Sequence, residues 1–396
     1  MPSSPVYLIT ILALLNLANY LDRYLVAPLG PLIQKDLGLS DAALGLVGSA
    51  FLWGFLAASL AIGALTRHWP RKTILLVSAA VWMVSTAASG LLGGFLILIA
   101  FRAASGFGQA AFTACAPTVI DDKVPTVTRG RVLAVFYAAI PLGTALAFIL
   151  GGMLGKAFGW QWACLLLGAS GLPLLLLLGT AKVGAQQSPK HSVSILQEIL
   201  DLAKSKRYIL AVLGYAAQTF ALGGFAFWAP TFLVRKFAYP AEQGSLIFGL
   251  ILVATGFCGS ILGGWMLDKF HKRDRVLAAL KLGALLTLAG LPFGFLAILT
   301  KAAPAFFFSM AVIQLAVFAT FSPINAAFLG AVKNEARTSA MGYATFFGRL
   351  FGDLISVWLV GAISDKTGSL TLGLLILPLA LVANLIFWLA ASRAKR

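Results

Sequence analysis

Long apolar segments separated by short polar ones make up the whole chain. Most apolar segments are about 20 residues long, the length that crosses a bilayer as an α-helix. Within them apolar and polar residues do not alternate, as they would in strands of a membrane β-barrel. We therefore predict an all-α integral membrane protein with twelve membrane-spanning helices. The spans lie near residues 6–27, 42–65, 73–93, 95–118, 132–156, 160–181, 208–234, 243–267, 276–299, 303–330, 337–362 and 369–392.

The composition supports this prediction, because 60% of the residues are hydrophobic and only 11% are charged. A soluble domain normally carries roughly a quarter charged residues. The cysteines and histidines show no metal-ligand spacing, so we expect no metal and no cofactor. These residues are Cys115, Cys164, Cys258, His68, His191 and His271.

The net charge of +17 is distributed like that of a membrane protein rather than a nucleic-acid-binding one. Twenty of the 30 Lys and Arg residues lie on one side of the predicted membrane and six on the other. The excess of Lys and Arg marks the cytoplasmic side, which places both termini there. No basic tract with interleaved aromatic residues is present, so we expect no nucleic acid partner. The absence of an Asn-x-Ser/Thr sequon favours a bacterial protein, of the inner membrane.

The longest loop divides the spans into six and six. We predict an N-terminal bundle over 1–181, a cytoplasmic linker with a short amphipathic helix over 182–207, and a C-terminal bundle over 208–396. The halves also repeat, since "GALTRHWPRKTILL" (63–76) and "GGWMLDKFHKRDRVL" (263–277) occupy equivalent places. Two pseudo-symmetric six-helix bundles that handle substrate between them near the midplane are typical of secondary transporters.

Several motifs resemble those of the major facilitator superfamily. They are "GALTRHWPRKT" between spans 2 and 3, "RAASGFGQAAF" (102–112) in span 4 and "PLGTALAFILGG" (141–152) in span 5. More narrowly, "NYLDRYLVA", "GWQWA", "GGFAFWAPTFL" and "GDLIS" resemble the spinster family of lipid transporters. The resemblance implies the superfamily fold, rocker-switch alternating access and a lysophospholipid- or sphingolipid-like substrate.

Two positions depart from the family patterns. Thr66 stands where the superfamily loop usually carries Asp, although the second-half loop keeps Asp268. Gln109 replaces an acid of span 4 that spinster-like proteins usually carry, so a proton-coupling role for that acid does not transfer. We expect a cytoplasmic latch in which Asp268 engages a helix N-terminus or a base such as Arg337. Its residues are Arg67, Arg71, Asp268 and Arg337.

Ionisable residues inside membranes are rare and usually face a bundle interior or a water-filled cavity. Asp22 and Arg102 both lie roughly 8–10 Å below the outer face by helix rise, so we expect them to meet as an ion pair. Asp22 is then a protonation switch, and Asp353 is the next acid to consider. A fixed structural pair between spans 1 and 4 is the alternative, and Arg349 with Asp353 has the spacing of a self-neutralising pair.

We expect an amphiphile with an anionic or zwitterionic head to bind among polar and aromatic side chains of both halves, with Arg102 or Arg349 for the head. Core packing explains the aromatic residues equally well. The predicted substrate contacts are Asn19, Tyr20, Arg23, Gln109, Tyr137, Gln218, Phe225, Trp228, Asn325 and Arg349.

Other functions fit the sequence less well. A carrier or exporter of drugs or small organic anions is the main alternative. An intramembrane aspartyl protease would use Asp22 and Asp353, but Leu350 stands where such enzymes usually have a glycine. A channel or receptor does not explain the repeated loop motifs. We therefore predict a transporter and no enzyme, monomeric, with a lipid-like substrate, protons and the bilayer as its partners.

Overall fold

The computed structural model describes residues 4–183, 195–270, 274–332 and 336–394, and all regular structure in these ranges is helical. Helices satisfy every backbone hydrogen bond internally, which the hydrocarbon of a membrane requires. The helices are α1 (Pro5–Tyr24), α2 (Val26–Leu37), α3 (Asp41–His68), α4 (Arg71–Leu92), α5 (Phe95–Lys123), α6 (Thr126–Ala169), α7 (Leu172–Thr180), α8 (Ile195–Ala203), α9 (Lys206–Phe237), α10 (Ala241–Phe270), α11 (Arg275–Leu299), α12 (Ala303–Ala319), α13 (Phe321–Gly330), α14 (Arg337–Phe351), α15 (Asp353–Thr367), α16 (Leu370–Leu374) and α17 (Ile376–Arg393).

Eleven helical segments of the described chain are long and apolar enough to cross a membrane. One of them, Arg131–Thr180, has 50 residues. At about 1.5 Å per residue it would extend roughly 75 Å, more than twice the thickness of the hydrocarbon core. Gly159 interrupts it with non-helical dihedrals of φ 85° and ψ 164°, so this segment supplies two crossings. The prediction of twelve spans is therefore confirmed.

The break at Gly159 is held by an acid from another helix. The Trp160 indole donates a hydrogen bond to Asp36 Oδ2 at 2.9 Å, and the Gln161 amide donates to the same oxygen at 2.8 Å. A residue with positive φ is strained unless it is glycine. The "GWQWA" segment therefore forms the turn between spans 5 and 6.

The chain folds into two compact units, each described here by itself. Unit 1 comprises residues 1–189 and 239–249, and unit 2 comprises 190–238 and 250–396. Much of the predicted linker, residues 184–194, lies outside the described residues. Helix α8, Ile195–Ala203, lies in the described part of that linker, where the sequence predicts a short amphipathic helix. Its position on a membrane surface stays a prediction.

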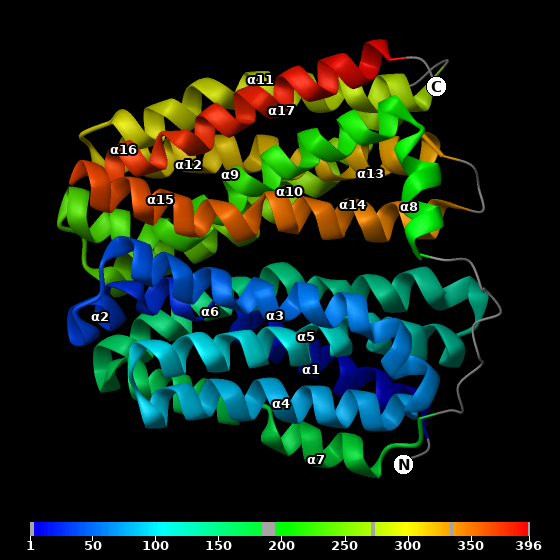
Figure 1. The fold of residues 1–396 in the computed structure, drawn as a ribbon, viewed down its shortest axis with the longest axis horizontal. Helices are drawn as coiled ribbons and strands as arrows, with labels where there is room; N and C mark the ends of the chain where they lie inside the picture. Colours follow the sequence, from blue (N-terminus) through cyan, green and yellow to red (C-terminus); the bar gives the residue numbers. More distant parts are fainter. Residues whose placement is uncertain (1–3, 184–194, 271–273, 333–335, 395–396) are drawn as a thin grey trace. The chain divides into compact units, whose positions relative to one another are not determined.

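Each unit has its own apolar core, and its helices run lengthwise beside one another (Figure 1). In unit 1, α5 packs between α3 and α4, while α1 packs along α6. The core there includes Leu12, Trp82, Phe112 and Phe136. In unit 2, α9 packs against α14, α15 and α17, and the core includes Tyr208, Phe328 and Trp388.

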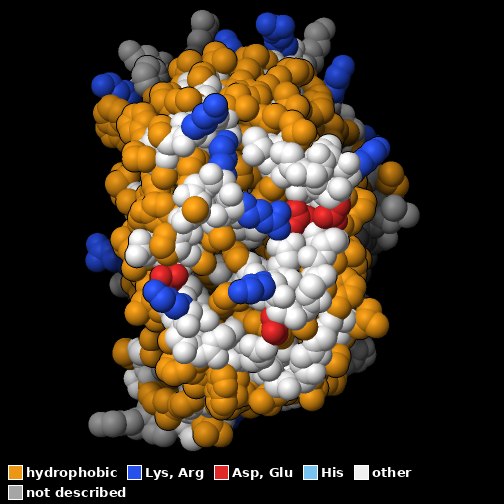
Figure 2. Space-filling model, turned by 90° about the vertical axis from the view of Figure 1, so that its left-hand side faces the viewer, with side chains coloured by type: hydrophobic (Ala, Val, Ile, Leu, Met, Phe, Trp, Pro, Cys, Tyr) orange, Lys and Arg blue, Asp and Glu red, His pale blue; other side chains and the backbone are white. Residues whose placement is uncertain are grey.

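Many large hydrophobic side chains remain exposed, as the lipid-facing surface of a membrane protein requires. Leu60, Leu96, Leu176 and Ile261 are each more than 60% exposed. Figure 2 shows one end of the molecule, where hydrophobic side chains take much of the surface and Lys and Arg side chains stand singly or in small groups. A soluble protein rarely exposes so much contiguous apolar area.

Candidate functional site

The backbone hydrogen-bond ladder of span 1 is interrupted beside its buried charges, although Leu25 keeps helical dihedrals of φ −57° and ψ −36°. Helix α1 ends at Tyr24 and α2 begins at Val26. Pro28 has no N–H to donate to the carbonyl four residues earlier, and its ring would clash with that carbonyl, which belongs to Tyr24. The Leu25 N–H turns instead to the Asp22 carbonyl at 3.2 Å. The break leaves backbone carbonyls of the last turn of α1 in need of donors.

Arg102 of α5 supplies these donors. Its Nη2 donates to the Arg23 carbonyl at 3.0 Å, and its Nη1 lies 3.5 Å from the Asp22 carbonyl. The guanidinium is 5% exposed and lies over the Phe51 ring, 5.0 Å from its centroid. A cation at the C-terminal end of a helix is also favoured by the helix dipole. Arg102 therefore caps the break in span 1.

The predicted meeting of Asp22 and Arg102 occurs, but in a different form. The two side chains do not form an ion pair within 4 Å, because the guanidinium binds the backbone at Asp22 and not its carboxylate. The carboxylate is only 2% exposed and accepts hydrogen bonds at Oδ2 from Ser105 at 2.9 Å and from Gln109 at 2.6 Å. The expected ion pair is thus corrected to a shared contact with the broken helix.

Arg23 is buried in the same cluster, rather than reaching outward to the membrane surface. Its Nε donates to Gln109 Oε1 at 3.1 Å. Its guanidinium carbon lies 4.6–5.2 Å from the ring centroids of Tyr20, Phe51 and Phe55, which suits cation–π contact. Gln109 therefore bridges the acid and the base that are adjacent in the sequence.

Close packing of α5 against α3 and α4 positions this cluster. A Cβ added at Gly106 would lie 1.9 Å from the Phe51 carbonyl oxygen, and one added at Gly108 would lie 2.6 Å from the Ser78 carbonyl oxygen. Arg102, Ser105 and Gln109 share one face of α5 because they are three and seven residues apart. The glycines on the other faces let α5 approach its neighbours, so this polar face meets α1.

The remaining predicted contacts of unit 1 differ in burial. Asn19 is fully buried, and neither its Oδ1 nor its Nδ2 has a hydrogen-bond partner. Tyr20 is partly buried beneath Arg23, and Tyr137 is 47% exposed. Ser105, Phe51 and Phe55 belong to the site but were not predicted. Ser105 could have been found from the sequence, because it lies one helical turn from Arg102.

A second broken span lies in unit 2. Helix α14 ends at Phe351 and α15 begins at Asp353, with Gly352 between them at φ −100° and ψ −97°. Arg349 Nη1 lies 3.9 Å from Asp353 Oδ2, which agrees with the predicted pair, and the two side chains are 24% and 23% exposed. Arg349 thus stands in the last turn of α14 and Asp353 in the first turn of α15, where the helix dipoles favour their charges.

Neighbouring residues of α9 leave room for this break. A Cβ added at Gly223 would lie 2.7 Å from Asp353 Oδ1, and the Thr219 hydroxyl donates to the Gly348 carbonyl at 2.7 Å. These two α9 residues face α14 and α15 directly. The break in unit 2 is therefore accommodated by a glycine and a hydroxyl of α9, whereas Pro28 and Arg102 shape the one in unit 1.

Most of the other predicted substrate contacts in unit 2 are buried inside the unit. Gln218 is 1% exposed and accepts from the Thr320 hydroxyl at 3.1 Å. The Trp228 indole is fully buried and donates to the Val357 carbonyl at 2.8 Å. Phe225 is also buried, while Asn325 is exposed. Trp228 and Phe225 thus fit the packing interpretation of the aromatic residues.

Unit 2 also has an apolar groove of about 310 Å³ among α9, α14 and α17. Its volume is at the lower end of the range for small-molecule pockets. Eight residues line it, all of them apolar: Leu213, Ala216, Ala217, Phe220, Phe351, Ile376, Ala380 and Ala383.

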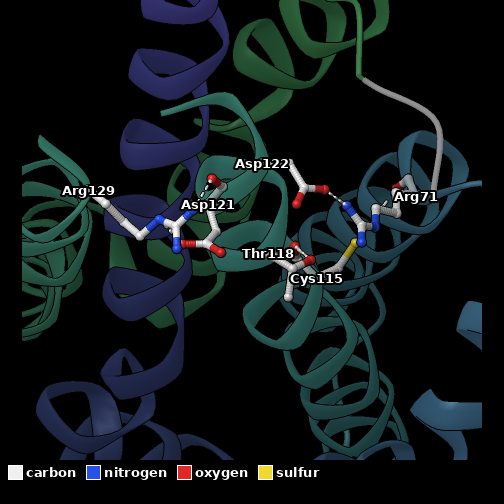
Figure 3. Close-up of polar contacts among 6 residues, drawn as sticks. All are labelled: Arg71, Cys115, Thr118, Asp121, Asp122 and Arg129. Carbon is white, nitrogen blue, oxygen red and sulfur yellow. Dashed lines mark hydrogen bonds and ion pairs between the residues drawn. The ribbon is translucent and has the colours of Figure 1, made fainter. Parts of the chain in front are cut away.

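Two of the predicted latch residues, Arg71 and Asp268, form ion pairs within single units. In unit 1, Arg71 pairs with Asp122, and Arg129 pairs with Asp121 at 2.5 Å (Figure 3). These pairs tie together the start of α4, the end of α5 and the start of α6. Figure 3 also shows Cys115 beneath Arg71, whose carbonyl its thiol approaches at 3.9 Å.

The second-half loop differs from its prediction. Asp268 pairs with Arg275 at 3.2 Å, and both side chains are more than half exposed. Arg337 donates instead to the Leu329 carbonyl at 3.0 Å. Asp268 therefore engages a base, as expected, but this base is Arg275 rather than Arg337, and the latch stays a prediction. The side chain of Arg67 lies outside the described residues.

Metal chemistry finds no support in the part of the chain that the structure describes. No three His, Cys, Asp or Glu residues come together there in a way that could hold a metal ion. The buried polar cluster around Asp22 instead combines one carboxylate, two guanidinium groups and an amide. Such a cluster can exchange a proton or bind an anion within the membrane.

Known proteins that are similar to this chain belong to one superfamily. Residues 12–355 match the model of the Major Facilitator Superfamily. Protein spinster homolog 3 of Danio rerio is 32% identical over 384 residues, which cover 90% of this chain and 76% of that protein. The sphingosine-1-phosphate transporter SPNS2 of Xenopus tropicalis is 31% identical over 416 residues, which cover 96% of this chain and 80% of that protein.

Among solved structures, a bacterial homologue of the human lysosomal transporter spinster superposes with a TM-score of 0.85. The superposition covers 99% of this chain and 98% of that one, at 20% sequence identity. Such low identity establishes the fold alone. Together with the helices described above, it establishes an all-α, multi-pass membrane protein.

Proposed function

Because the chain belongs to the Major Facilitator Superfamily and, within it, to the spinster family, we propose that it moves a lipid-like amphiphile across the membrane by proton-coupled alternating access. The matched relatives are transporters and not enzymes. The proposed substrate is an anionic or zwitterionic lysophospholipid or sphingolipid. The named substrate of the Xenopus tropicalis relative, a sphingosine phosphate, belongs to this chemical class.

The observation that carries the proposal is the buried cluster of Asp22, Arg23, Arg102 and Gln109. Charged groups within a membrane are costly, and they persist where a pathway or a proton relay uses them. In this cluster Asp22 is the only acid, and its carboxylate is held by the neutral donors Ser105 and Gln109. Neutral donors permit the carboxyl group to gain and lose a proton without separating a direct ion pair. We therefore assign the proton switch to Asp22.

The two arginine sites suit different tasks. Arg102 is 5% exposed and its N–H groups donate to backbone carbonyls of α1. It therefore supports the switch by stabilising the end of α1. Arg349 is 24% exposed beside Asp353, and it suits an anionic headgroup better. Asp353 is then the second acid whose protonation can follow the substrate. In this proposal Arg102 is a positioning residue and Arg349 is the headgroup contact.

Orientation and location follow from the distribution of charge. We place the two connections that contain Arg71 and Arg129 in the cytoplasm, together with both termini, on the positive-inside rule. The pairs of Arg71 with Asp122 and of Arg129 with Asp121 then tie the cytoplasmic ends of α4, α5 and α6 into one body. A rigid unit of this kind is what alternating access by rocking requires. The membrane is the bacterial inner membrane.

Transport by purified protein in liposomes tests the proposal. A lysophospholipid, a sphingosine phosphate and a small hydrophilic organic anion are each offered with and without an imposed pH gradient. We expect lipid transport that depends on the gradient and no transport of the small anion. Transport of the small anion alone would instead indicate a carrier of drugs or organic anions. Lipid transport that does not depend on the gradient would contradict proton coupling and support the proposed substrate class.

A further inference from the structure

The two oxygens of the Asp22 carboxylate have unequal surroundings. Oδ2 accepts hydrogen bonds from Ser105 and Gln109, whereas Oδ1 is buried and has no hydrogen bond of normal geometry. The amide of Gln109 is oriented by Arg23, because a guanidinium donates only and must face the amide oxygen. The amide nitrogen therefore points to Oδ2 as a donor in every protonation state. A proton on this carboxyl group must sit on Oδ1.

Thr86 of α4 carries a hydroxyl within hydrogen-bonding range of this carboxylate, in addition to the donors already bound at Oδ2. It is 5% exposed, and its hydroxyl has no hydrogen bond of normal geometry either. Buried Ser and Thr residues in helices usually donate to a carbonyl of the preceding turn. Ser78 and Ser89 of the same helix do so, at 3.1 Å and 2.7 Å. The Thr86 hydroxyl makes no such bond to a carbonyl of its own helix, so it is available to bind the Asp22 carboxylate.

A hydroxyl suits both states of the acid, because it can donate and accept. It donates to Oδ1 when Asp22 is ionised. When Oδ1 carries the proton, the hydroxyl accepts that proton's hydrogen bond and turns its own hydrogen to the Trp82 carbonyl, four residues earlier in α4. The only covalent change is the gain of one proton by Oδ1.

The other groups near Asp22 do not provide this exchange. The charged and titratable groups that face it from its own and the packed helices are Arg23 of α1, Arg102 of α5 and Cys164 of α6. The two guanidinium groups donate only, so neither accepts a hydrogen bond from a protonated carboxyl. A thiol is a weak donor and a weak acceptor. Ser105 also carries a hydroxyl, but that hydroxyl already donates to Oδ2. Among the described residues, Thr86 is therefore the hydroxyl that remains for Oδ1.

We propose that Thr86 is a positioning residue of the proton switch, whose hydroxyl exchanges donor for acceptor at Asp22 Oδ1 as the acid is protonated. This inference rests on the proposed role of Asp22 in proton coupling. It assigns the reacting oxygen of the carboxyl group and adds a third helix, α4, to the cluster that α1 and α5 form.

The test uses full-length protein in liposomes and two measurements. The pH dependence of transport gives the midpoint of the switch. Infrared difference spectra of protein with isotope-labelled aspartate give the C=O stretch of protonated Asp22, identified by its loss in Asp22→Asn. We expect Thr86→Val to shift the midpoint by about 0.5–1 unit to higher pH, because a hydrogen bond to a carboxylate is stronger than one to the neutral acid. We also expect the C=O band at higher wavenumber.

Three control variants make the outcome specific. Thr86→Ser keeps the hydroxyl and should retain both wild-type values, and Thr86→Ala should repeat the result of Thr86→Val should the latter fail to fold. Thr144→Val removes an equally buried hydroxyl that donates to the Ile140 carbonyl of its own helix, and should leave both values unchanged.

Two results would overturn the inference: wild-type values in Thr86→Val and Thr86→Ala, or an equal shift in Thr144→Val. The failure of the proposed function is distinguishable, because the wild-type protein would then show no pH-dependent band that disappears in Asp22→Asn.

Discussion

The two broken spans of this transporter place their charges in different environments. At the break between α1 and α2, Asp22, Arg23 and Arg102 are 2%, 7% and 5% exposed and bind groups on a different helix. At the break between α14 and α15, Arg349 and Asp353 are about a quarter exposed and face each other along one span at 3.9 Å. The first break is closed to solvent, whereas the second remains accessible.

This difference indicates a division of tasks between the units. A buried carboxylate held by neutral donors can register a proton, but a substrate headgroup has no access to it. A part-exposed pair such as Arg349 and Asp353 contributes little to stability. In the proposed function, an anionic headgroup competes with Asp353 for Arg349. Substitutions at these residues test the contrast between the buried charges of unit 1 and the part-exposed pair of unit 2.

Replacing the acid at each break should separate the two tasks most clearly. Asp22→Asn mimics the protonated acid, so we expect it to abolish transport driven by a pH gradient while substrate binding persists. Asp353→Asn should reduce that transport without abolishing it. Transport assays with and without the gradient, together with thermal shifts on adding lysophospholipid, measure both effects. Wild-type transport by Asp22→Asn would make Asp22 structural, and Asp353 would then become the candidate switch.

Removing the buried cation should destabilise unit 1 strongly. Arg102→Ala leaves the Arg23 carbonyl without its donor and removes the nearest α5 cation from the Asp22 carboxylate. Losing one partner of a buried charged group costs on the order of 3–5 kcal/mol. Thermal unfolding in detergent measures the loss. The double variant with Asp22→Asn should recover part of the lost stability, and no recovery would mean that capping of the broken helix accounts for the whole effect.

Adding a methyl group at the α3–α5 contact should destabilise unit 1 less than Arg102→Ala does. Gly106→Ala places a Cβ 1.9 Å from the Phe51 carbonyl oxygen, so the helices must separate. Overpacking of this kind costs about 1–3 kcal/mol. Gly342→Ala in α14 is the matched control, because a Cβ there meets nothing within 4 Å. Equal unfolding temperatures for the two variants would contradict the close packing assigned to α5.

Removing the exposed cation should have the smallest effect on stability. Arg349→Ala breaks a part-exposed pair, and such pairs contribute about 0–1 kcal/mol. We expect unfolding close to wild type but weaker binding of an anionic lysolipid, measured as a smaller ligand-induced thermal shift. Arg349→Lys should retain part of this binding. A loss of stability as large as that of Arg102→Ala would show that the two breaks are equivalent.

The helical fold could be predicted from the sequence, because span length and hydropathy report directly on the bilayer. The turn at Gly159 was placed correctly between spans 5 and 6, since glycine is common where the backbone must turn. The first span was predicted to end near residue 27, but helix continues as α2 to Leu37. The polar residues near its end do not stop a helix once it has left the hydrocarbon.

The candidate site could be predicted in its members but not in its contacts. Helix rise predicts one depth for Asp22 and Arg102, and in the structure the Arg102 guanidinium reaches the Asp22 and Arg23 carbonyls. The sequence does not reveal that Pro28 breaks α1 at Tyr24 and thereby offers carbonyls that compete for the guanidinium. Phe51 and Phe55 were missed for a related reason, because only the glycine contact between α3 and α5 brings them over Arg23.

The sequence by itself determined which segments cross the membrane, which loops are basic and which ionisable residues lie within the spans, because these properties depend on local composition and on helix geometry. Only the tertiary structure decided which partner each charge has. Donors and acceptors from α1, α4 and α5 meet the aromatic rings of α3 at Asp22, Arg23 and Arg102. The outcome depends on how closely glycine-mediated contacts let those helices approach. Distance and direction between helices are three-dimensional quantities that no single segment encodes.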